Sequence, residues 1–220
     1  MKTLVITLPL NTQHQEQFKK VVGNHHVVFC KSSELDLSLV QSAHAMIGHI
    51  PDKLIKGSTN LEWLQLQSAG TGGYVSLAKE LGFLLTNASG AYGLAISEHM
   101  LGMTLCLQKN IHRYIVNKQH ALWQDEGNVR SISSSTVLII GLGDIGSSYA
   151  KKCKALGSRT IGIRRTVRQK PDEVDAVFTL EDIDELLPQA DIVACCLPET
   201  NETMQLMNAD RINLMKKGSR

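Results

Sequence analysis

The amino-acid sequence predicts an α/β protein built from two successive parallel sheets. In its first half, five short apolar runs alternate with polar stretches of helical character; the runs are residues 4–8, 26–30, 45–49, 63–67 and 83–87. In its second half, the alternation resumes with VLIIGLGDIG, a continuous apolar strand that ends in a glycine-rich loop. Strand and helix signals that alternate in this way favour parallel sheets with helices on both faces.

The composition excludes several classes of protein. A chain of 220 residues with 43% hydrophobic and 20% charged residues is typical of ordinary globular domains. The net charge of +2 gives no reason to expect nucleic acid or an acidic membrane as partner. No apolar run approaches the roughly 18 residues that a membrane span needs. The five cysteines form no C-x-x-C pair, so we expect a reducing, cytoplasmic compartment with neither disulfides nor a bound metal.

Residues 94–107 predict a long helix with two apolar faces. One face carries apolar side chains at the spacing i, i+4, i+7 and i+11, namely Ile96, Met100, Met103 and Leu107. The opposite side is apolar as well, through Leu94, Leu101 and Leu105. We therefore expect this helix to be buried nearly all round, either within the core or with one face against a second subunit. The second half is expected to start near residue 100, with its sheet beginning at Thr136.

The glycine-rich loop predicts a dinucleotide-binding Rossmann unit. Gly141, Gly143 and Gly146 match the pattern G-x-G-x-x-G. In that pattern the first glycine allows a tight turn, the second lets the backbone approach a pyrophosphate, and the third permits close packing of helix on strand. A helix that begins near Asp144 would direct unpaired N–H groups and its positive dipole end toward the phosphates. The loop follows a strand, opens a helix and precedes a second strand at 160–163, which is the context that supports this interpretation.

The second strand of this unit ends in arginines. About 20 residues past the glycines, an NAD site usually carries an acid that binds the adenosine ribose. Here the positions are Arg164 and Arg165, followed by Thr166 and Arg168. Guanidinium groups can hold a 2′-phosphate that a carboxylate would repel, and the missing acid also disfavours S-adenosylmethionine. We predict NADP(H) as the preferred coenzyme, with NAD(H) as the other candidate; a solvated arginine pair at a strand end is the structural alternative.

Two further strands are expected at 176–178 and 191–196, with the helical EDIDELLPQA between them. Leu197 and Pro198 end the last strand at the edge of the sheet where a cofactor should lie. With the strand order 3-2-1-4, residues 191–196 form an outer strand although their sequence is that of an interior one. Its outward backbone groups would then lack hydrogen-bond partners.

Taken in order, these segments resemble the D-isomer-specific 2-hydroxyacid dehydrogenase family, which includes glyoxylate/hydroxypyruvate reductases and phosphoglycerate dehydrogenases. The resemblance is carried by LQLQSAGTGGYV, LTNASGAYGLAISEHMLGMTLCLQKNI, LIIGLGDIG, DIVACCLPETNETMQLMN and LMKKGS. It implies a flavodoxin-like substrate domain at residues 1–100, without its closing C-terminal helix. A partial Rossmann NAD(P)-binding domain would follow at 101–220.

The resemblance also assigns roles to residues. Backbone N–H groups of Gly70, Thr71 and Gly72 would bind the substrate carboxylate, with Thr71 also reaching the cofactor; the alternative is a simple tight turn. Gly141, Gly143 and Gly146 would contact the cofactor, with Asp144 and Ile145 at the pyrophosphate. Arg164 and Arg165 would lie at the adenosine end. Leu197, Pro198 and Thr203 would lie on the nicotinamide side. Members of this family pair as homodimers through the cofactor domain, which implies contacts along residues 94–107 and near Trp123.

The family's catalytic arginine, glutamate and histidine would lie past Arg220, so no catalytic residue is assigned in this chain. We interpret His49, His99 and His112 as loop or helix residues. The implied function is NAD(P)-dependent oxidation and reduction at the CH–OH group of small D-2-hydroxy acids, by a truncated chain with little activity alone. The alternative is a non-catalytic, dinucleotide-sensing scaffold of the corepressor type, because one fold serves several functions.

Overall fold

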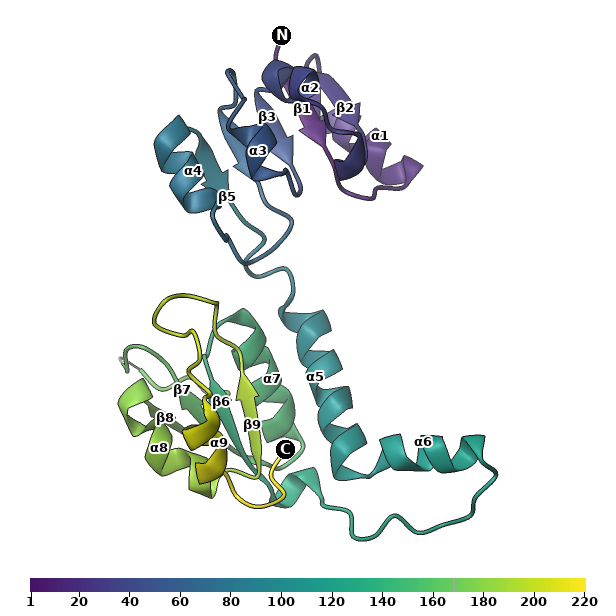
Figure 1. The fold of residues 1–220 in the computed structure, drawn as a ribbon, viewed down its shortest axis with the longest axis vertical. Coiled ribbons are helices and arrows are strands. Elements are labelled where there is room, and N and C mark those ends of the chain that lie inside the picture. The colour runs from purple at the N-terminus through teal and green to yellow at the C-terminus, as the bar shows by residue number, and fades with distance from the viewer. Residues whose placement is uncertain (168) are drawn as a thin grey trace. The chain divides into compact units, whose positions relative to one another are not determined.

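The computed structural model describes residues 1–167 and 169–220; Arg168, one of the arginines expected near the adenosine end, lies outside the described residues. The chain divides into two compact units, Met1–Ser89 and Gly90–Arg220 (Figure 1). The division expected at residue 100 falls inside helix α5 (Gly93–Gln108), which belongs as a whole to the second unit. No helix among the described residues is both long and apolar enough to cross a bilayer.

The first unit contains a five-stranded parallel sheet in the order β2-β1-β3-β4-β5. Its strands are β1 (Thr3–Ile6), β2 (His26–Phe29), β3 (Ala45–Ile47), β4 (Trp63–Gln65) and β5 (Leu84–Thr86). All five predicted strands are confirmed, each somewhat shorter than its apolar run. This order is the flavodoxin-like one.

Helices cover both faces of this sheet, because successive strand residues point to opposite sides. Val5, Met46 and Leu64 pack in one core with residues of α2, α3 and α4. Leu4, Ile6 and Ile47 pack in another core with residues of α1. The helices are α1 (Thr12–Val22), α2 (Leu37–Ser42), α3 (Asp52–Ile55) and α4 (Tyr74–Leu81), with a 3₁₀ turn at Ser32–Glu34.

The second unit contains a four-stranded parallel sheet in the order β8-β7-β6-β9. Its strands are β6 (Thr136–Ile140), β7 (Arg159–Ile163), β8 (Ala176–Phe178) and β9 (Ile192–Cys195). The predicted order 3-2-1-4 and the start at Thr136 are confirmed. We expected the outer backbone groups of β9 to lack partners, but two of them are hydrogen-bonded. The Arg220 N–H donates to the Asp191 carbonyl and the Arg220 carbonyl accepts from the Val193 N–H, both at 2.9 Å.

Helices cover both faces of this sheet as well (Figure 1). Val137 and Ile139 pack with Tyr149 and Cys153 of α7 and with apolar residues of α5. Leu138 and Ile140 pack on the other side, against residues of α8 and its flanking turns. The remaining elements are α6 (Ile111–Gln119), α7 (Asp144–Ala155), α8 (Ile183–Leu186), α9 (Ala209–Leu214) and 3₁₀ turns at Ile132–Ser134, Leu180–Asp182 and Leu187–Gln189.

Within its own unit α5 is not buried nearly all round, so burial of this helix wholly in the core is wrong, and burial of one face against a second subunit stays a prediction. Leu94, Ile96 and Met103 are 68%, 37% and 53% exposed. The most buried positions of α5 are instead small or polar: Gly93, Ser97, Thr104 and Gln108. Small side chains let α7 approach closely, and the polar groups bond across the contact: the Thr104 and Tyr149 hydroxyls lie 2.6 Å apart, and Lys152 Nζ donates to Ser97 Oγ at 2.7 Å. Much of the apolar surface of α5 therefore faces away from its own unit.

We expect Gln108, at the end of α5, to lower the stability of the protein. Its side chain is 2% exposed, and neither its amide nitrogen nor its amide oxygen has a hydrogen-bond partner among the residues that the structure describes. Burying an unpaired amide costs about 1–3 kcal/mol. We expect Gln108→Met, which keeps length and helix propensity, to raise the free energy of unfolding in urea by about 1 kcal/mol. A loss of stability would instead reveal a partner for the amide.

Candidate dinucleotide site

The glycine loop joins β6 to α7 and lies between the carboxyl ends of β7 and β9. The Gly141 N–H donates to the Ile163 carbonyl at 2.8 Å, and Gly141 has φ +103°. A Cβ on Gly141 would lie 2.8 Å from the Cys196 carbonyl oxygen, and one on Gly146 would lie 1.9 Å from the Gly141 carbonyl oxygen. A side chain at Gly141 would collide with the chain that follows β9, and one at Gly146 would collide with the loop on which α7 packs.

Gly143 is the opposite case. A Cβ at this position would meet no protein atom within 4 Å, so the backbone here borders open space. The first hydrogen bond within α7 runs from the Ser147 N–H to the Gly143 carbonyl at 2.9 Å. The N–H groups of the preceding turn, at residues 144–146, are therefore the unpaired donors of a helix start. An open backbone surface beside these donors and the positive helix end fits a pyrophosphate.

The Asp144 side chain bonds to a different helix. Its carboxylate accepts a hydrogen bond from the Gly93 N–H at 2.8 Å, at the start of α5. Tyr92, at the N-cap position of α5, supplies no side-chain cap, so Asp144 provides the acceptor that this helix end needs. A contact between Asp144 and a pyrophosphate therefore rests on its backbone N–H.

Two hollows lie near the ends of β7 and β9, at the position expected for the adenosine end. A hollow of about 60 Å³ brings together five residues singled out from the sequence, Arg164, Arg165, Leu197, Pro198 and Thr203, with Ile163, Leu180, Thr200 and Glu202. Leu197, Pro198 and Thr203, expected on the nicotinamide side, therefore lie with the arginines expected at the adenosine end. The Arg165 guanidinium forms an ion pair with Glu202, with 3.2 Å between Arg165 Nη2 and Glu202 Oε2. Arg164 is anchored by its backbone N–H, which donates to the Phe178 carbonyl at 3.1 Å.

A second hollow, of about 280 Å³, also has Arg164 in its wall, together with Gln169, Lys170, Pro171 and Asp172. Sequence reasoning missed Lys170 and Glu202 as site residues. Lys170 follows Arg165 by only a few positions, so a search for further basic residues after Arg165 could have indicated it. Glu202 directly precedes Thr203 but pairs with a residue 37 positions away, and no local pattern encodes that contact.

The surroundings of Thr203 and Cys196 favour a role in the fold for both side chains. The Thr203 hydroxyl donates to the Pro198 carbonyl at 2.6 Å and accepts from the Thr200 N–H at 2.8 Å, which folds residues 198–203 into a closed turn. Burial, with a smaller contribution from neighbouring Cys195, raises the pKa of the Cys196 thiol to about 11. Cys196 is therefore protonated at neutral pH and poorly suited to act as a nucleophile.

In the first unit, Gly70, Thr71 and Gly72 form a loop after β4. Asn87 Nδ2 donates to the Ala69 carbonyl, Ser68 Oγ donates to the Gly70 carbonyl, and both distances are 2.7 Å. Among the described hydrogen bonds, none is donated by the N–H groups of residues 70–72. The loop borders a hollow of about 640 Å³ lined by Thr71, Val75, Ala78, Lys79, Phe83, Leu85, Thr86 and Asn87. Backbone donors left open in this way are suited to a carboxylate.

The three histidines considered from the sequence lie on different elements. His99 is in α5 and His112 in α6. His49 follows β3, and its Nδ1 lies 3.0 Å from the hydroxyl of Tyr74, which donates to the Ile50 carbonyl at 2.8 Å. Burial, then the nearby charge of Asp52, raises the pKa of Tyr74. In the described part of the chain, no cluster of three or more histidine, cysteine or acidic side chains could hold a metal ion.

Comparison with known proteins identifies the family. Residues 101–220, more than half of the chain, match the model of the D-isomer specific 2-hydroxyacid dehydrogenase NAD binding domain. The chain belongs to the D-isomer specific 2-hydroxyacid dehydrogenase family. Its second unit is accordingly the NAD-binding domain of that family, and the glycine loop lies at the start of its sheet.

Individual relatives agree with this assignment. The D-3-phosphoglycerate dehydrogenase of Methanocaldococcus jannaschii is 26% identical, over 100% of this chain and 43% of its own length. The hydroxypyruvate reductase of Thermotoga maritima is 28% identical, over 84% of this chain and 58% of its own length. The chain thus spans about half the length of these curated relatives.

Solved structures show the same fold. A D-isomer specific 2-hydroxyacid dehydrogenase family protein from Aeromonas salmonicida has a TM-score of 0.88 and 26% identity, over 99% of this chain and 71% of its own. The D-lactate dehydrogenase from Aquifex aeolicus, solved with NAD and lactic acid, has a TM-score of 0.80 at 21% identity, over 98% of this chain and 66% of its own. A Xanthobacter autotrophicus protein solved with NADPH has a TM-score of 0.78 at 20% identity, over 99% of this chain and 70% of its own. Since proteins of this fold were solved with either coenzyme, the fold alone does not choose between NAD and NADP.

Proposed function

We propose that this protein acts in the reduction of small 2-oxo acids to D-2-hydroxy acids, with NADP(H) preferred over NAD(H). One observation carries the proposal: Gly143 borders open space at the start of α7, while Gly141 and Gly146 have no room for a side chain. A loop of this shape accepts a pyrophosphate on its backbone and keeps α7 tight against the sheet. The family of the second unit supplies the reaction class.

The coenzyme preference rests on the residues after β7. Arg164 occupies the position where an NAD site has its ribose-binding acid, and it borders both hollows of the adenosine end. Lys170 adds a second cation to the larger hollow. Two cations can balance most of the double charge of a 2′-phosphate.

In this proposal, bound NADPH supplies the hydride. The chain's own residues bind and orient: the N–H groups at residues 70–72 hold the substrate carboxylate, and those at the start of α7 hold the pyrophosphate. We assign no proton donor within the 220 residues, so turnover by the chain alone should be slow.

The substrate assignment is tested on the NADPH-loaded chain by backbone amide NMR. Adding glyoxylate or hydroxypyruvate should shift the amide signals of Gly70, Thr71 and Gly72, while a steady-state assay shows little NADPH oxidation. NADPH binding without any shift in this loop would contradict the substrate assignment and favour the non-catalytic scaffold. Rapid turnover would show that a proton donor lies within the chain.

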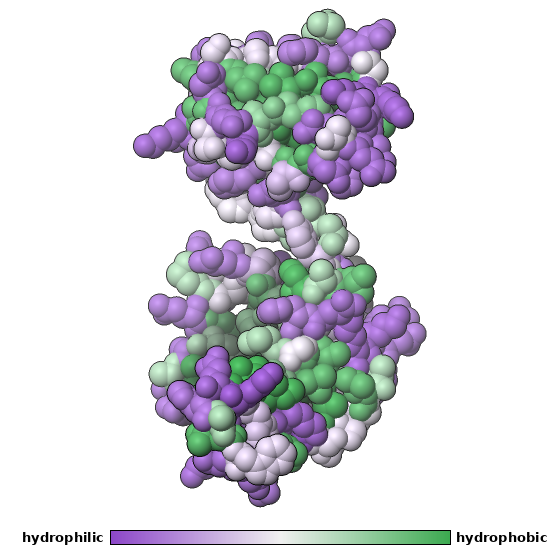
Figure 2. Space-filling view, turned by 90° about the vertical axis from the view of Figure 1, so that its right-hand side faces the viewer, coloured by the Kyte–Doolittle hydropathy of each residue, from purple (hydrophilic) through white to green (hydrophobic). Residues whose placement is uncertain are grey.

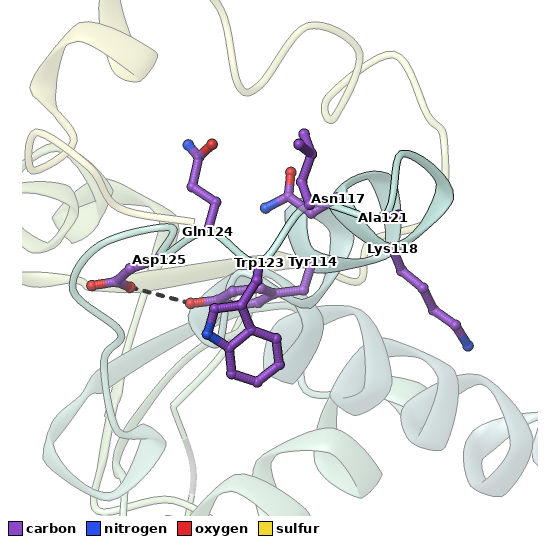
Figure 3. A pocket seen from close by; sticks show the side chains of 8 residues that line it. Tyr114, Asn117, Lys118, Ala121, Trp123, Gln124 and Asp125 are labelled. Atoms are coloured by element: carbon purple, nitrogen blue, oxygen red, sulfur yellow. Dashed lines mark hydrogen bonds between the residues drawn. The ribbon is translucent and has the colours of Figure 1, made fainter.

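We also propose that the second unit forms homodimers through α5, α6 and the loop after α6. Large apolar side chains are exposed along these elements: Leu94, Met103, Ile115, Val116, Leu122 and Trp123. Figure 2 views the molecule from the side on which α6 lies in Figure 1 and shows apolar surface among hydrophilic side chains in this unit. A hollow of about 650 Å³ beside α6 is lined by Tyr114, Trp123 and their neighbours (Figure 3). Exposed apolar side chains that gather on neighbouring elements support a protein contact.

The dimer proposal predicts that Ile115→Glu combined with Val116→Glu yields a monomer in sedimentation equilibrium, where the wild type sediments as a dimer. Both side chains are just over half exposed, at 53% and 52%, so the charges cost little in the monomer but would be buried in a dimer. The control is Val21→Glu on α1, which is 86% exposed and should leave the dimer intact. A dimer that survives the double substitution places the contact elsewhere.

A further inference from the structure

The ion pair between Arg165 and Glu202 has a consequence for coenzyme choice, which rests on the function proposed above. Glu202 is the acidic residue in the wall of the hollow that also contains Arg164 and Arg165. Its carboxylate lies 3.2 Å from the Arg165 guanidinium. One of the two guanidinium groups proposed to receive a 2′-phosphate is therefore already bound to an anion of the same chain.

The pair does little for the fold. The side chains of Arg165 and Glu202 are 82% and 74% exposed, and exposed ion pairs contribute little to stability because water and salt screen them. The turn that contains Glu202 is held by other bonds, from the Thr203 hydroxyl to the Pro198 carbonyl and from the Met204 N–H to the Thr200 carbonyl. Replacing the Glu202 carboxylate should therefore leave this segment folded.

The pair spans the wall of a small hollow. The hollow holds about 60 Å³, whereas pockets that enclose small ligands hold about 300–1,000 Å³. Arg165 comes from the end of β7 and Glu202 from the turn after β9, so their ion pair bridges the two strand ends that form the wall.

The other charged groups at this end leave Glu202 as the direct competitor for Arg165. Lys170 Nζ donates to the Val174 carbonyl at 3.0 Å and lines the larger hollow with Asp172 and Arg164. Asp172 lines the larger hollow and not the one that contains Arg165. The Glu202 carboxylate contacts Arg165 through Nη2, so a phosphate that takes a bidentate bond involving Nη2 would compete with Glu202 for that nitrogen.

We propose that Glu202 is a specificity-determining residue: its carboxylate holds Arg165 in the free protein and must release it to a 2′-phosphate. Glu202 thereby weakens the preference for NADP(H) that the two arginines create. NADH carries no 2′-phosphate, so its affinity depends far less on this exchange.

The test measures the dissociation constants of NADPH and NADH by calorimetry on the full chain, for wild type, Glu202→Gln and the control Glu185→Gln. Glu185 lies in α8 and lines neither hollow of the adenosine end. We expect Glu202→Gln to bind NADPH three- to tenfold more tightly, about 0.7–1.4 kcal/mol, with NADH changed less than twofold. Glu185→Gln should change neither constant by twofold.

The same substitution in the Arg165→Gln variant makes the test specific. Adding Glu202→Gln to Arg165→Gln should change NADPH affinity by less than twofold, because the guanidinium for which the carboxylate and the phosphate compete is absent. Unchanged NADPH affinity in Glu202→Gln, an equal gain for NADH, or the same gain without Arg165 would each overturn the inference. If the folded wild type binds neither coenzyme, the proposed function itself fails; if it binds and Glu202→Gln has no effect, this inference alone fails.

Discussion

Gly146→Ala should destabilise the second unit by about 3 kcal/mol or more and abolish coenzyme binding. The added methyl group would lie 1.9 Å from the Gly141 carbonyl oxygen and 3.2 Å from Ile139 Cγ2. The first neighbour is backbone and cannot rotate away, so α7 would have to move off the sheet and carry its first turn with it. Thermal unfolding followed by circular dichroism measures the loss.

Gly143→Ala is the matched variant in the same loop, and we expect a different outcome. Its Cβ meets no protein atom within 4 Å and its φ of −85° suits any residue, so stability should stay within about 0.5 kcal/mol. Coenzyme affinity should fall at least tenfold, because the methyl group occupies the space where a pyrophosphate would lie.

Gly102→Ala controls for the substitution itself. Gly102 is an exposed position within α5 with no atom within 4 Å of an added Cβ, and alanine there should stabilise the helix by up to about 1 kcal/mol. Wild-type coenzyme affinity in Gly143→Ala would show that the loop does not contact the pyrophosphate.

The second large effect concerns the arginines. Arg164→Gln combined with Arg165→Gln should weaken NADPH binding about 100-fold and NADH binding less than threefold. Each hydrogen bond to a charged group is worth about 1.5–3 kcal/mol, and the loss is below the sum because Arg165 is shared with Glu202. Calorimetry with NADPH and with NADH measures how far the double substitution weakens the binding of each coenzyme.

The control for this pair is Arg159→Gln. Arg159 is an exposed arginine at the other end of β7, so the variant removes a positive charge from the same strand. It should leave the ratio of NADPH to NADH affinity unchanged. Equal losses for both coenzymes in the double arginine variant would show that Arg164 and Arg165 support folding or adenosine binding and do not read the 2′-phosphate.

The sheets could be predicted from the sequence because the strands are short, apolar and separated by polar helices. Residues 137–140 are fully buried on both faces of their sheet, and an unbroken apolar run of this length is typical of a central parallel strand. The glycines were also informative: Gly141 and Gly146 have no room for a side chain, and Gly143 borders open space beside the start of α7. Chain order then placed the loop at the carboxyl edge of its sheet.

What the sequence could not predict are contacts between distant segments. The spacing of apolar residues in α5 shows two apolar faces but not which face packs on α7, and the small residues Gly93 and Ser97 decided it. Asp144 bonds to Gly93, 51 positions away, although its place beside the glycines suggested a phosphate contact. Glu202 was passed over for the same reason, because its partner Arg165 belongs to another strand end.

The most direct test of the central claim is a titration of the ¹⁵N-labelled chain with NADPH, followed by backbone amide NMR. The account predicts saturable binding of one coenzyme per chain, with the largest shifts at Gly143, Asp144, Ile145 and Arg164. Absence of saturable binding to the folded chain, or binding that leaves the amides of residues 141–146 unmoved, would contradict it.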